Sequence, residues 1–179
     1  MMIFNTLQQA QDFIQNFELI KNNIEQPIEV LERLKACEQI AKEHHEYKLL
    51  SKSRIFLTNY YIQTNDLENA LTIGLQNKKL TEDENLEEEQ LNCYSGLLNI
   101  YHMLGDYSSL EELISIYRDK LINTNNLNKL CSLYIISAIQ YYTLKEFKKC
   151  IDANEKALEY AKKINNTELL IHVYNNYGF

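Results

Sequence analysis

The chain has very few of the residues that interrupt helices. It contains 1 proline and 4 glycines in 179 residues. Proteins built from β-sheets need frequent turns, and glycine and proline are the strongest turn signals. Their scarcity therefore argues against a β-rich fold and favours helices joined by short polar loops. Because 45% of the residues are hydrophobic, the chain can bury a continuous core without disulfides or metals.

Paired cysteines and long apolar runs are also missing. Cys37, Cys93, Cys131 and Cys150 lie far apart within apolar helical patterns, so we predict small buried residues in a reducing compartment. No apolar run approaches the ~20 residues that cross a membrane. The N-terminal sequence "MMIFNTLQQAQDF" lacks the basic and apolar regions of a signal peptide. These absences predict a cytoplasmic protein with no membrane partner.

Positive charge is in deficit, since the formal net charge is -7. A nucleic-acid surface needs clustered lysine and arginine, so no nucleic-acid partner is predicted. Acidic residues gather in "TEDENLEEE", from Thr81 to Glu89. We interpret this stretch as a solvated loop and helix start, where acidic side chains suit the helix dipole. The alternative is an acidic docking patch.

No set of residues resembles a catalytic or metal site. His44 and His45 are adjacent, so on a helix their side chains point about 100° apart and do not readily share a metal. His102 and His172 have no cysteine or acidic residue at ligand spacing. Serine-histidine-aspartate sets, glycine-rich phosphate loops and zinc-binding helices of the H-E-x-x-H type are missing too. The sequence predicts no enzyme, no metal and no cofactor.

What the chain does contain is a repeat. "YSGLLNIYHMLGDYSSLEELISIY" from Tyr94 and "YIISAIQYYTLKEFKKCIDANEKA" from Tyr134 align after a shift of 40 residues. Tyr174 extends the column of Tyr94 and Tyr134. Further columns contain aromatic or apolar residues: Tyr61, Tyr101 and Tyr141; Leu67, Tyr107 and Phe147; Ala70, Leu110 and Cys150. The first unit departs from the pattern, as terminal repeats often do.

Each unit is predicted to form two helices. Arg54, Leu57, Thr58 and Tyr61 share one face of a first helix by their three-and-four spacing. Gly105 and Asp106 mark a helix end and the N-cap of the next helix. The second helix of that unit carries apolar residues at Leu110, Leu113, Ile114, Tyr117 and Leu121.

These units resemble tetratricopeptide repeats, which pair two antiparallel helices around an aromatic, a Leu-Gly and a tyrosine. "YSGLLNIYHMLGDYSSL" carries the resemblance most fully, although the period of 40 exceeds the family's ~34. The resemblance implies an all-α, right-handed superhelical solenoid of about nine helices. Its expected parts are a divergent repeat at 1–45, three repeats at 46–166 and the first helix of an incomplete repeat at 167–179. Leu97, Tyr101, Leu110, Tyr141 and Phe147 are expected in the core.

The final sequence "HVYNNYGF" reads as a first helix without its partner. Three explanations are open: a fragment of a longer protein, a solvating cap, or packing on another chain. We expect Tyr174 and Tyr177 to pack near Ala157 and Leu158, and Asn175 to face the groove. Self-association through this helix is a further expectation.

In a solenoid of helix pairs the first helices line the inner groove, and a ligand binds beside their packing faces. Asn59 and Asn99 occupy the same place in successive repeats, and asparagine can hold a peptide backbone by donating and accepting. The alternative is chance, since asparagine is abundant. The resemblance to the family implies that Lys52 and Asn59 contribute to binding a C-terminal carboxylate, but a full clamp is not present among the residues of the stripe. The mixed polar and apolar groove predicts an uncharged or hydrophobic peptide. The predicted groove residues are Ile55, Asn59, Ile62, Ser95, Asn99, His102, Ile135, Ile139, Tyr142 and Asn175.

The resemblance implies a protein- or peptide-binding scaffold, or the sensor module of a cytoplasmic bacterial signalling protein, as part of a longer chain. The protein or peptide ligand would lie in the concave groove. The alternative is a regulatory N-terminal segment of an enzyme, such as a diguanylate cyclase, whose catalytic domain lies beyond residue 179.

Overall fold

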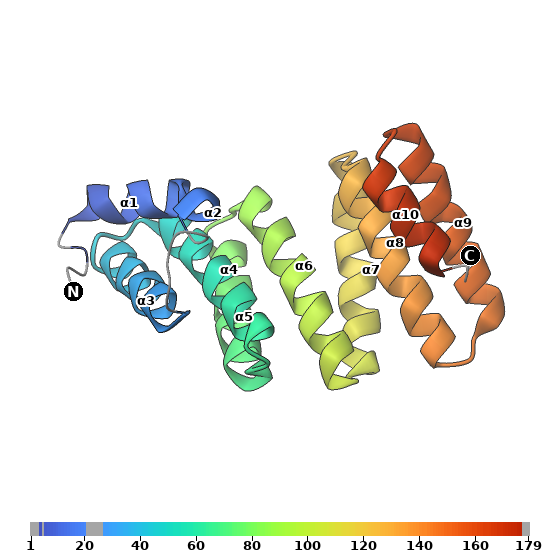
Figure 1. Ribbon diagram of the computed structural model, residues 1–179, viewed down its shortest axis with the longest axis horizontal. Helices are drawn as coiled ribbons and strands as arrows, with labels where there is room; N and C mark the ends of the chain where they lie inside the picture. Colours follow the sequence, from blue (N-terminus) through green and yellow to red (C-terminus); the bar gives the residue numbers. More distant parts are fainter. Residues whose placement is uncertain (1–3, 5, 21–26, 177–179) are drawn as a thin grey trace. The chain divides into compact units, whose positions relative to one another are not determined.

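The computed structural model describes residues 4, 6–20 and 27–176, and these residues form helices and short connections without any strand. The predicted all-α fold is therefore confirmed (Figure 1). The helices are α1 Leu7–Gln15, α2 Phe17–Ile20, α3 Pro27–Glu43, α4 Tyr47–Gln63, α5 Leu67–Asp83, α6 Glu87–Leu104, α7 Tyr107–Asn123, α8 Leu127–Thr143, α9 Phe147–Lys163 and α10 Thr167–Asn176.

Only Asn16 separates α1 from α2. Its backbone N–H and its side-chain amide both donate to the Asp12 carbonyl, which ends α1 with a polar cap. If α1 and α2 are counted as one interrupted helix, the described residues hold the nine helices that the repeat pattern predicts. The grouping into 1–45, 46–166 and 167–179 and the handedness of the superhelix stay predictions.

From α3 onward the helix ends repeat a single turn. After α3, the N–H of Glu46 donates to the Ala41 carbonyl and the N–H of His45 donates to the Lys42 carbonyl, which is a Schellman motif. The residue in the left-handed conformation recurs every 20 positions: His45, Asn65, Asn85, Gly105, Asn125, Lys145 and Asn165. Asparagine and glycine tolerate this conformation best, so the many asparagines of the loops have a structural role.

The N-caps follow directly on these turns. The carboxylates of Asp66 and Asp106 accept from the backbone N–H groups of Asn69 and Ser109, and Asn126 caps α8 in the same way. The Gly105–Asp106 stop and start is thereby confirmed. One residue thus ends each helix and the next one caps the following helix, which keeps the connections from α3 onward to two or three residues.

Lys145 is the least suited of the residues in these turns, because its φ of 61° costs a residue with a side chain more than glycine. We expect Lys145→Gly to raise the free energy of unfolding by about 0.5–1 kcal/mol. Lys148→Gly, at the second residue of α9, is the matched control and should lower it by up to about 1 kcal/mol, because glycine is less favourable than lysine in a helix. Urea denaturation followed by circular dichroism measures both changes. A destabilised Lys145→Gly would contradict this account of the turn.

The chain divides into two compact units, Met1–Ile100 and Tyr101–Phe179. In the first unit α3 packs on α4 and α4 on α5, while α1 crosses α3 and α4 (Figure 1). The core contains fully buried side chains from these helices and from α6: Ala10, Leu34, Cys37, Leu57, Ala70, Tyr94 and Leu97. The predicted apolar face of α4 is confirmed, since Arg54, Leu57, Thr58 and Tyr61 are all buried.

Three of the four cysteines are buried, and all four are free thiols. Burial raises the pKa of the Cys37 and Cys93 thiols to about 12. The thiol of Cys93 lies against the Gly74 carbonyl, 3.4 Å away. Cys150 differs from the prediction because it is only half-buried.

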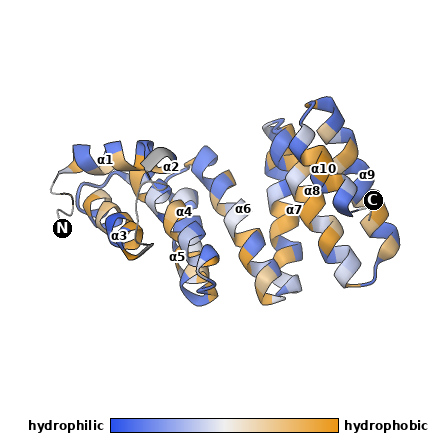
Figure 2. Cartoon of the chain, viewed as in Figure 1, coloured by the Kyte–Doolittle hydropathy of each residue, from blue (hydrophilic) through white to orange (hydrophobic). Residues whose placement is uncertain are grey.

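In the second unit α8 packs closely on α9, and α10 packs on both. The centre of this core is a cluster of small residues, Cys131, Ala157, Ala161 and Val173, which lets the helices approach closely. Figure 2 shows the hydrophobic residues along α8 and α10. Leu110 is fully buried as predicted, whereas Tyr101 and Tyr141 are half-buried.

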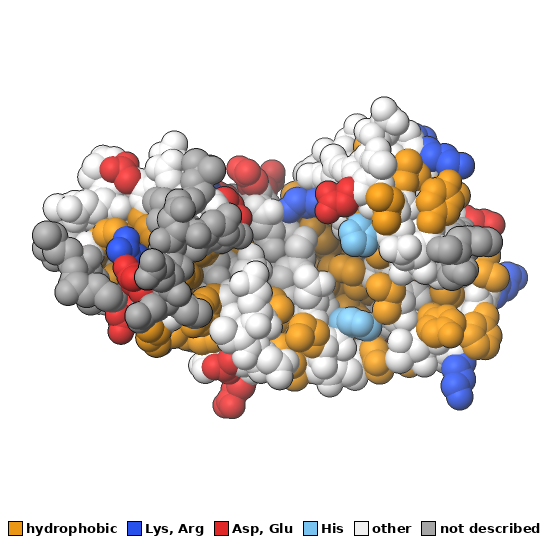
Figure 3. Space-filling view, viewed as in Figure 1, with side chains coloured by type: hydrophobic (Ala, Val, Ile, Leu, Met, Phe, Trp, Pro, Cys, Tyr) orange, Lys and Arg blue, Asp and Glu red, His pale blue; other side chains and the backbone are white. Residues whose placement is uncertain are grey.

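The prediction that Phe147 lies in the core is wrong, since 56% of its surface is exposed. Phe147 is the first residue of α9, and its ring meets the exposed Tyr142 ring in an edge-to-face contact with 6.1 Å between centroids. Figure 3 shows hydrophobic side chains at the surface of this unit.

The expected packing of α10 through Tyr174 is also wrong. Val173 is fully buried against Ala157 and Ala161, whereas Tyr174 is 44% exposed. Leu169 and Leu170 pack beside Val173, so the buried face falls one position before the predicted one. Asn175 is exposed, and its expected place in the groove stays a prediction. Tyr177 lies outside the described residues.

Among the described residues, none of the helices has the length and hydrophobicity required to span a bilayer.

Candidate functional site

The predicted groove residues fall in both units. In the first unit, Ile55 and Ile62 are half-buried on α4 and Asn59 is exposed between them. On α6, Ser95 is half-buried and donates its hydroxyl to the Leu91 carbonyl, and Asn99 is exposed. Asn59 and Asn99 are therefore exposed to solvent, as contact with a ligand requires.

The remaining predicted residues belong to the second unit. His102 is half-buried, and its Nδ1 is enclosed without a hydrogen-bond partner among the described residues. Ile135 packs against the small-residue core, so it has a structural role. Ile139 is 37% exposed and Tyr142 is 66% exposed. Whether these side chains join those of the first unit in a single groove stays a prediction.

A large hollow in the first unit lies between α1, α4 and α6. Its volume is about 750 Å³, which falls within the range of roughly 300–1,000 Å³ typical of ligand sites. We call it the α1–α4–α6 groove, and it is lined by Gln8, Gln11, Ile14, Gln15, Glu46, Lys48, Leu49, Lys52, Ile55, Phe56, Glu88 and Asn92. Of the predicted stripe, Ile55 lines this groove.

The apolar part of the lining is continuous with the core. Ile14 and Leu49 are buried beneath the surface of the groove. The Phe56 ring packs on Phe17 with 4.3 Å between centroids, which joins α2 to α4. A second, much smaller hollow between α4, α5 and α6 is lined by Ile55, Asn59 and Asn92 among others. Ile55 and Asn92 therefore border both hollows.

One lysine of the groove is committed to an ion pair inside the protein. The Lys48 ammonium lies 3.5 Å from the Glu89 carboxylate and 3.9 Å from that of Glu88. Glu89 is only 3% exposed, so Lys48 supplies the countercharge that this buried carboxylate needs. This pair ties the start of α6 to the start of α4.

Lys52 is one turn further along α4, and its ammonium forms no ion pair with the residues that the structure describes. Its charge is therefore available for an anionic group. Around it the lining offers amides: Gln11 and Gln15 on α1, and Asn92 on α6. An amide both donates and accepts hydrogen bonds, which matches the alternating N–H and C=O groups of a peptide backbone.

Sequence reasoning missed the contribution of α1, because the first unit departs from the repeat and gives no register. Two signals were present. Gln8, Gln11 and Gln15 follow the three-and-four spacing that places side chains on one helix face. Asn92 lies 40 residues after Lys52, in the same column of the repeat.

No group of three or more histidine, cysteine, aspartate or glutamate residues in the described part of the chain could hold a metal ion. The absence of a catalytic activity and of a cofactor stays a prediction.

Comparison with known proteins gives a likeness in structure. No protein-family model and no curated protein sequence matches this chain. Among solved structures, the chain resembles the crystal structure of aspartyl phosphate phosphatase F from Bacillus subtilis, with a TM-score of 0.83 and 16% sequence identity. The likeness covers 96% of this chain and 45% of that chain. It supports the predicted helical-repeat fold, and this chain spans less than half the length of the protein it resembles.

Proposed function

We propose that this chain is a peptide-binding helical-repeat scaffold, and that the α1–α4–α6 groove holds an extended peptide. The observation that carries the proposal is the groove itself, which combines one uncommitted lysine, several amides and an apolar floor. Lys52 would bind a carboxylate of the peptide, either an acidic side chain or the C-terminus. Gln11, Gln15 and Asn92 would hold its backbone, with Asn59 and Asn99 beyond them as further amide contacts.

The apolar floor adds a preference for one hydrophobic side chain. Ile55 and Phe56 are half-buried, so part of each is open to a ligand. Burial of one such ligand side chain contributes about 1.5–3 kcal/mol. The ligand that fits this chemistry is a short peptide with a hydrophobic residue near a carboxylate.

We propose that this peptide binding serves a cytoplasmic sensor that has no catalytic activity of its own. The exposed Ile171 and Tyr174 on α10 support self-association through the last helix, since exposed apolar side chains favour contacts with a second surface. The alternative, a regulatory segment of a diguanylate cyclase or another enzyme, stays a prediction that no contact in the structure favours.

A selection from random peptides tests the proposal. A displayed library of ten-residue peptides with free C-termini would be panned on the chain, and the selected peptides synthesised and titrated by fluorescence anisotropy. Lys52→Ala should raise the dissociation constant by about ten-fold or more, because a charge-assisted hydrogen bond contributes about 1.5–3 kcal/mol. Lys79→Ala, an exposed residue of α5 outside the groove, is the matched control and should change nothing.

The proposal fails if no peptide is enriched, or if the selected peptides bind Lys52→Ala and Lys79→Ala with the same affinity as the unaltered chain.

A further inference from the structure

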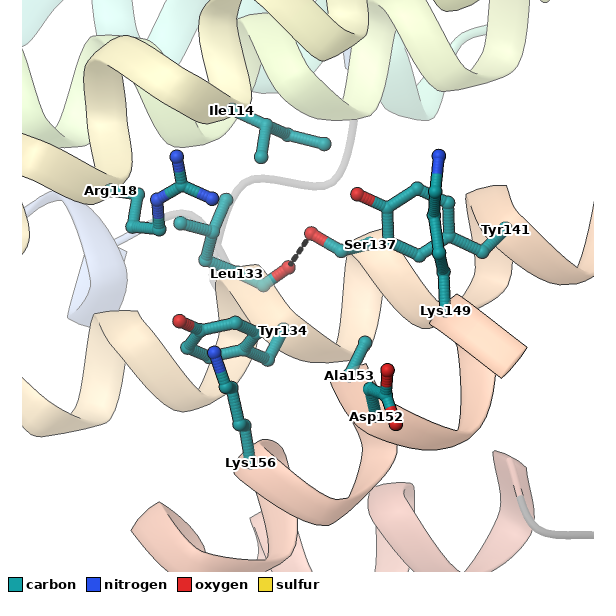
Figure 4. Close-up of a pocket in the computed structure, with 10 residues that line it drawn as sticks. All are labelled: Ile114, Arg118, Leu133, Tyr134, Ser137, Tyr141, Lys149, Asp152, Ala153 and Lys156. Carbon is teal, nitrogen blue, oxygen red and sulfur yellow. Dashed lines mark hydrogen bonds between the residues drawn. The ribbon is translucent and has the colours of Figure 1, made fainter. Parts of the chain in front are cut away.

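The second unit contains a pocket that the peptide groove does not involve. Its volume is about 160 Å³, and it lies between α7, α8 and α9 (Figure 4). Leu133, Tyr134 and Ser137 of α8 form its floor, and α7 and α9 contribute its charged walls. Tyr134 and Tyr141 share one face of α8, and Ile135, Ile139 and Tyr142 lie on the neighbouring face. The pocket therefore opens on a face different from the predicted stripe.

Two of its three cations are available to a ligand. Lys149 is engaged, because its ammonium lies 2.8 Å from the Glu146 carboxylate, an interaction that raises the pKa of Lys149. The Lys156 ammonium lies over the Tyr134 ring, 5.2 Å from its centroid, and pairs with no carboxylate of the described residues. Arg118 has only a long contact of 3.9 Å with Asp119, its neighbour in the chain.

An acidic group faces the same space. Asp152 lies on α9 between Lys149 and Lys156, and its carboxylate points into the pocket in Figure 4. It forms no ion pair or hydrogen bond with any residue that the structure describes. The Ser137 hydroxyl, by contrast, is used within α8, where it donates to the Leu133 carbonyl at 2.9 Å. The pocket therefore presents positive charge at Arg118 and Lys156 and negative charge at Asp152.

The size of the pocket restricts what it can bind. A water molecule occupies about 30 Å³ in the liquid, so the space corresponds to only a few waters. It is smaller than the sites of drug-sized ligands, which begin at roughly 300 Å³. A ligand with a single anion would meet the uncompensated Asp152, whereas a ligand with both charges would satisfy the cations and the carboxylate together.

We propose that this pocket binds a small zwitterion of the size of a free α-amino acid. Arg118 and Lys156 hold its carboxylate, and Asp152 holds its ammonium group. The Tyr134 ring, fixed by stacking on Tyr160 at 5.7 Å between centroids, supplies the flat surface beside the ligand. Such a site would let the scaffold respond to a small metabolite independently of any peptide.

Titration with free amino acids tests this assignment. Each of the twenty protein amino acids would be added separately to the ¹⁵N-labelled chain, and amide shifts followed by NMR. We expect saturable shifts at residues of α7, α8 and α9 for at least one amino acid. Its N-acetyl derivative, which lacks the positive charge, should bind about ten-fold more weakly or worse, since charged hydrogen bonds are the strong ones.

Three variants separate the roles of the charges. Arg118→Ala should weaken the amino acid and its N-acetyl derivative alike, whereas Asp152→Asn should weaken the amino acid and leave the derivative nearly unchanged. Lys162→Ala, an exposed residue of α9 outside the pocket, should alter neither. Circular dichroism shows that each variant folds. The proposal is overturned if no amino acid shifts these residues, if the derivative binds as well as its parent, or if Asp152→Asn binds the parent unchanged.

Discussion

Leu97→Ala is expected to lower the free energy of unfolding by about 3–4 kcal/mol, because it empties a site that cannot collapse. Leu97 is fully buried in α6. Across from it stands Gly74 of α5, and a Cβ placed on Gly74 would lie 2.8 Å from Leu97 Cδ2. The leucine thus occupies the space that a side chain on α5 would fill. Urea denaturation of the variant, followed by circular dichroism, measures the loss.

This geometry also predicts the sign of a double-mutant cycle. Gly74→Ala alone gains helix propensity of about 1 kcal/mol but crowds Leu97, at a cost of about 1–3 kcal/mol. In the Leu97→Ala background the added methyl enters the cavity, so Gly74→Ala should stabilise the protein. Leu75→Ala, beside Gly74 and 43% exposed, is the control and should change stability far less. Additive effects in the cycle would contradict the proposed contact.

Arg54→Ala is expected to cost about 3 kcal/mol, because it leaves a buried carboxylate with too little countercharge. The Arg54 guanidinium donates to Glu38 at 3.0 Å and to the Gln76 carbonyl at 3.2 Å, so it joins α3, α4 and α5. Both charged side chains are about nine-tenths buried, at 10% and 12% exposure. Lys42 retains a contact of 2.8 Å with Glu38, which limits the loss.

The control for Arg54→Ala is Arg33→Ala, which removes a partly exposed pair with Glu29 within α3 and should cost no more than about 0.5 kcal/mol. Thermal and urea denaturation compare the two variants. The double variant Glu38→Leu with Arg54→Leu should be more stable than Arg54→Ala, since it removes both charges together. Equal losses for Arg54→Ala and Arg33→Ala would show that the buried pair has no special role.

The same pair makes stability depend on pH. Burial raises the pKa of Glu38, but hydrogen bonds from Lys42 and Arg54 and their charges outweigh it, so the pKa lies below its ordinary value of 4.5. The folded state therefore favours the ionised carboxylate. The stabilisation is fully present above the ordinary value and is lost as the pH falls through the lowered pKa. Urea denaturation at several pH values should show that Glu38→Gln loses less stability on acidification than the unaltered chain.

The repeat could be predicted from the sequence because packing and turns impose it on every unit. The tyrosine and leucine columns gave the helix faces of α4 and α6, and Gly105–Asp106 gave one helix boundary. The finer period of 20 residues was harder to see. Asparagine, histidine, lysine and glycine all occupy the left-handed position of the turns, so residue type alone does not mark it.

The errors in the core have a common physical origin. Phe147 and Tyr174 are aromatic members of the repeat columns. A column shows that residues occupy the same position in successive repeats, but it does not show that a neighbouring helix buries them. Phe147 is the first residue of its helix, and Val173 rather than Tyr174 shares the buried face of α10 with Leu169 and Leu170. The Arg54–Glu38 pair had one signal, a charged residue on an apolar face, but the partner on α3 could be found only in three dimensions.

The candidate site was predicted only in part. Ile55 and Lys52 could be placed from the register of α4, because that helix follows the repeat. The glutamines of α1 could not, since the first unit lacks the columns that fix its orientation. The pocket between α7, α8 and α9 depends on charges from three helices, and no spacing within a single helix brings Arg118 near Lys156.

The location of a bound peptide tests the central claim most directly. A peptide selected from the random library would carry p-benzoylphenylalanine at its hydrophobic position, and photo-crosslinked residues would be identified by mass spectrometry. We predict crosslinks to α1, α4 and α6, near Gln11, Ile55 and Asn92, and their loss when the unmodified peptide competes. Crosslinks confined to α9 or α10, or crosslinks that the unmodified peptide does not compete away, would contradict the assignment of the α1–α4–α6 groove as the peptide site.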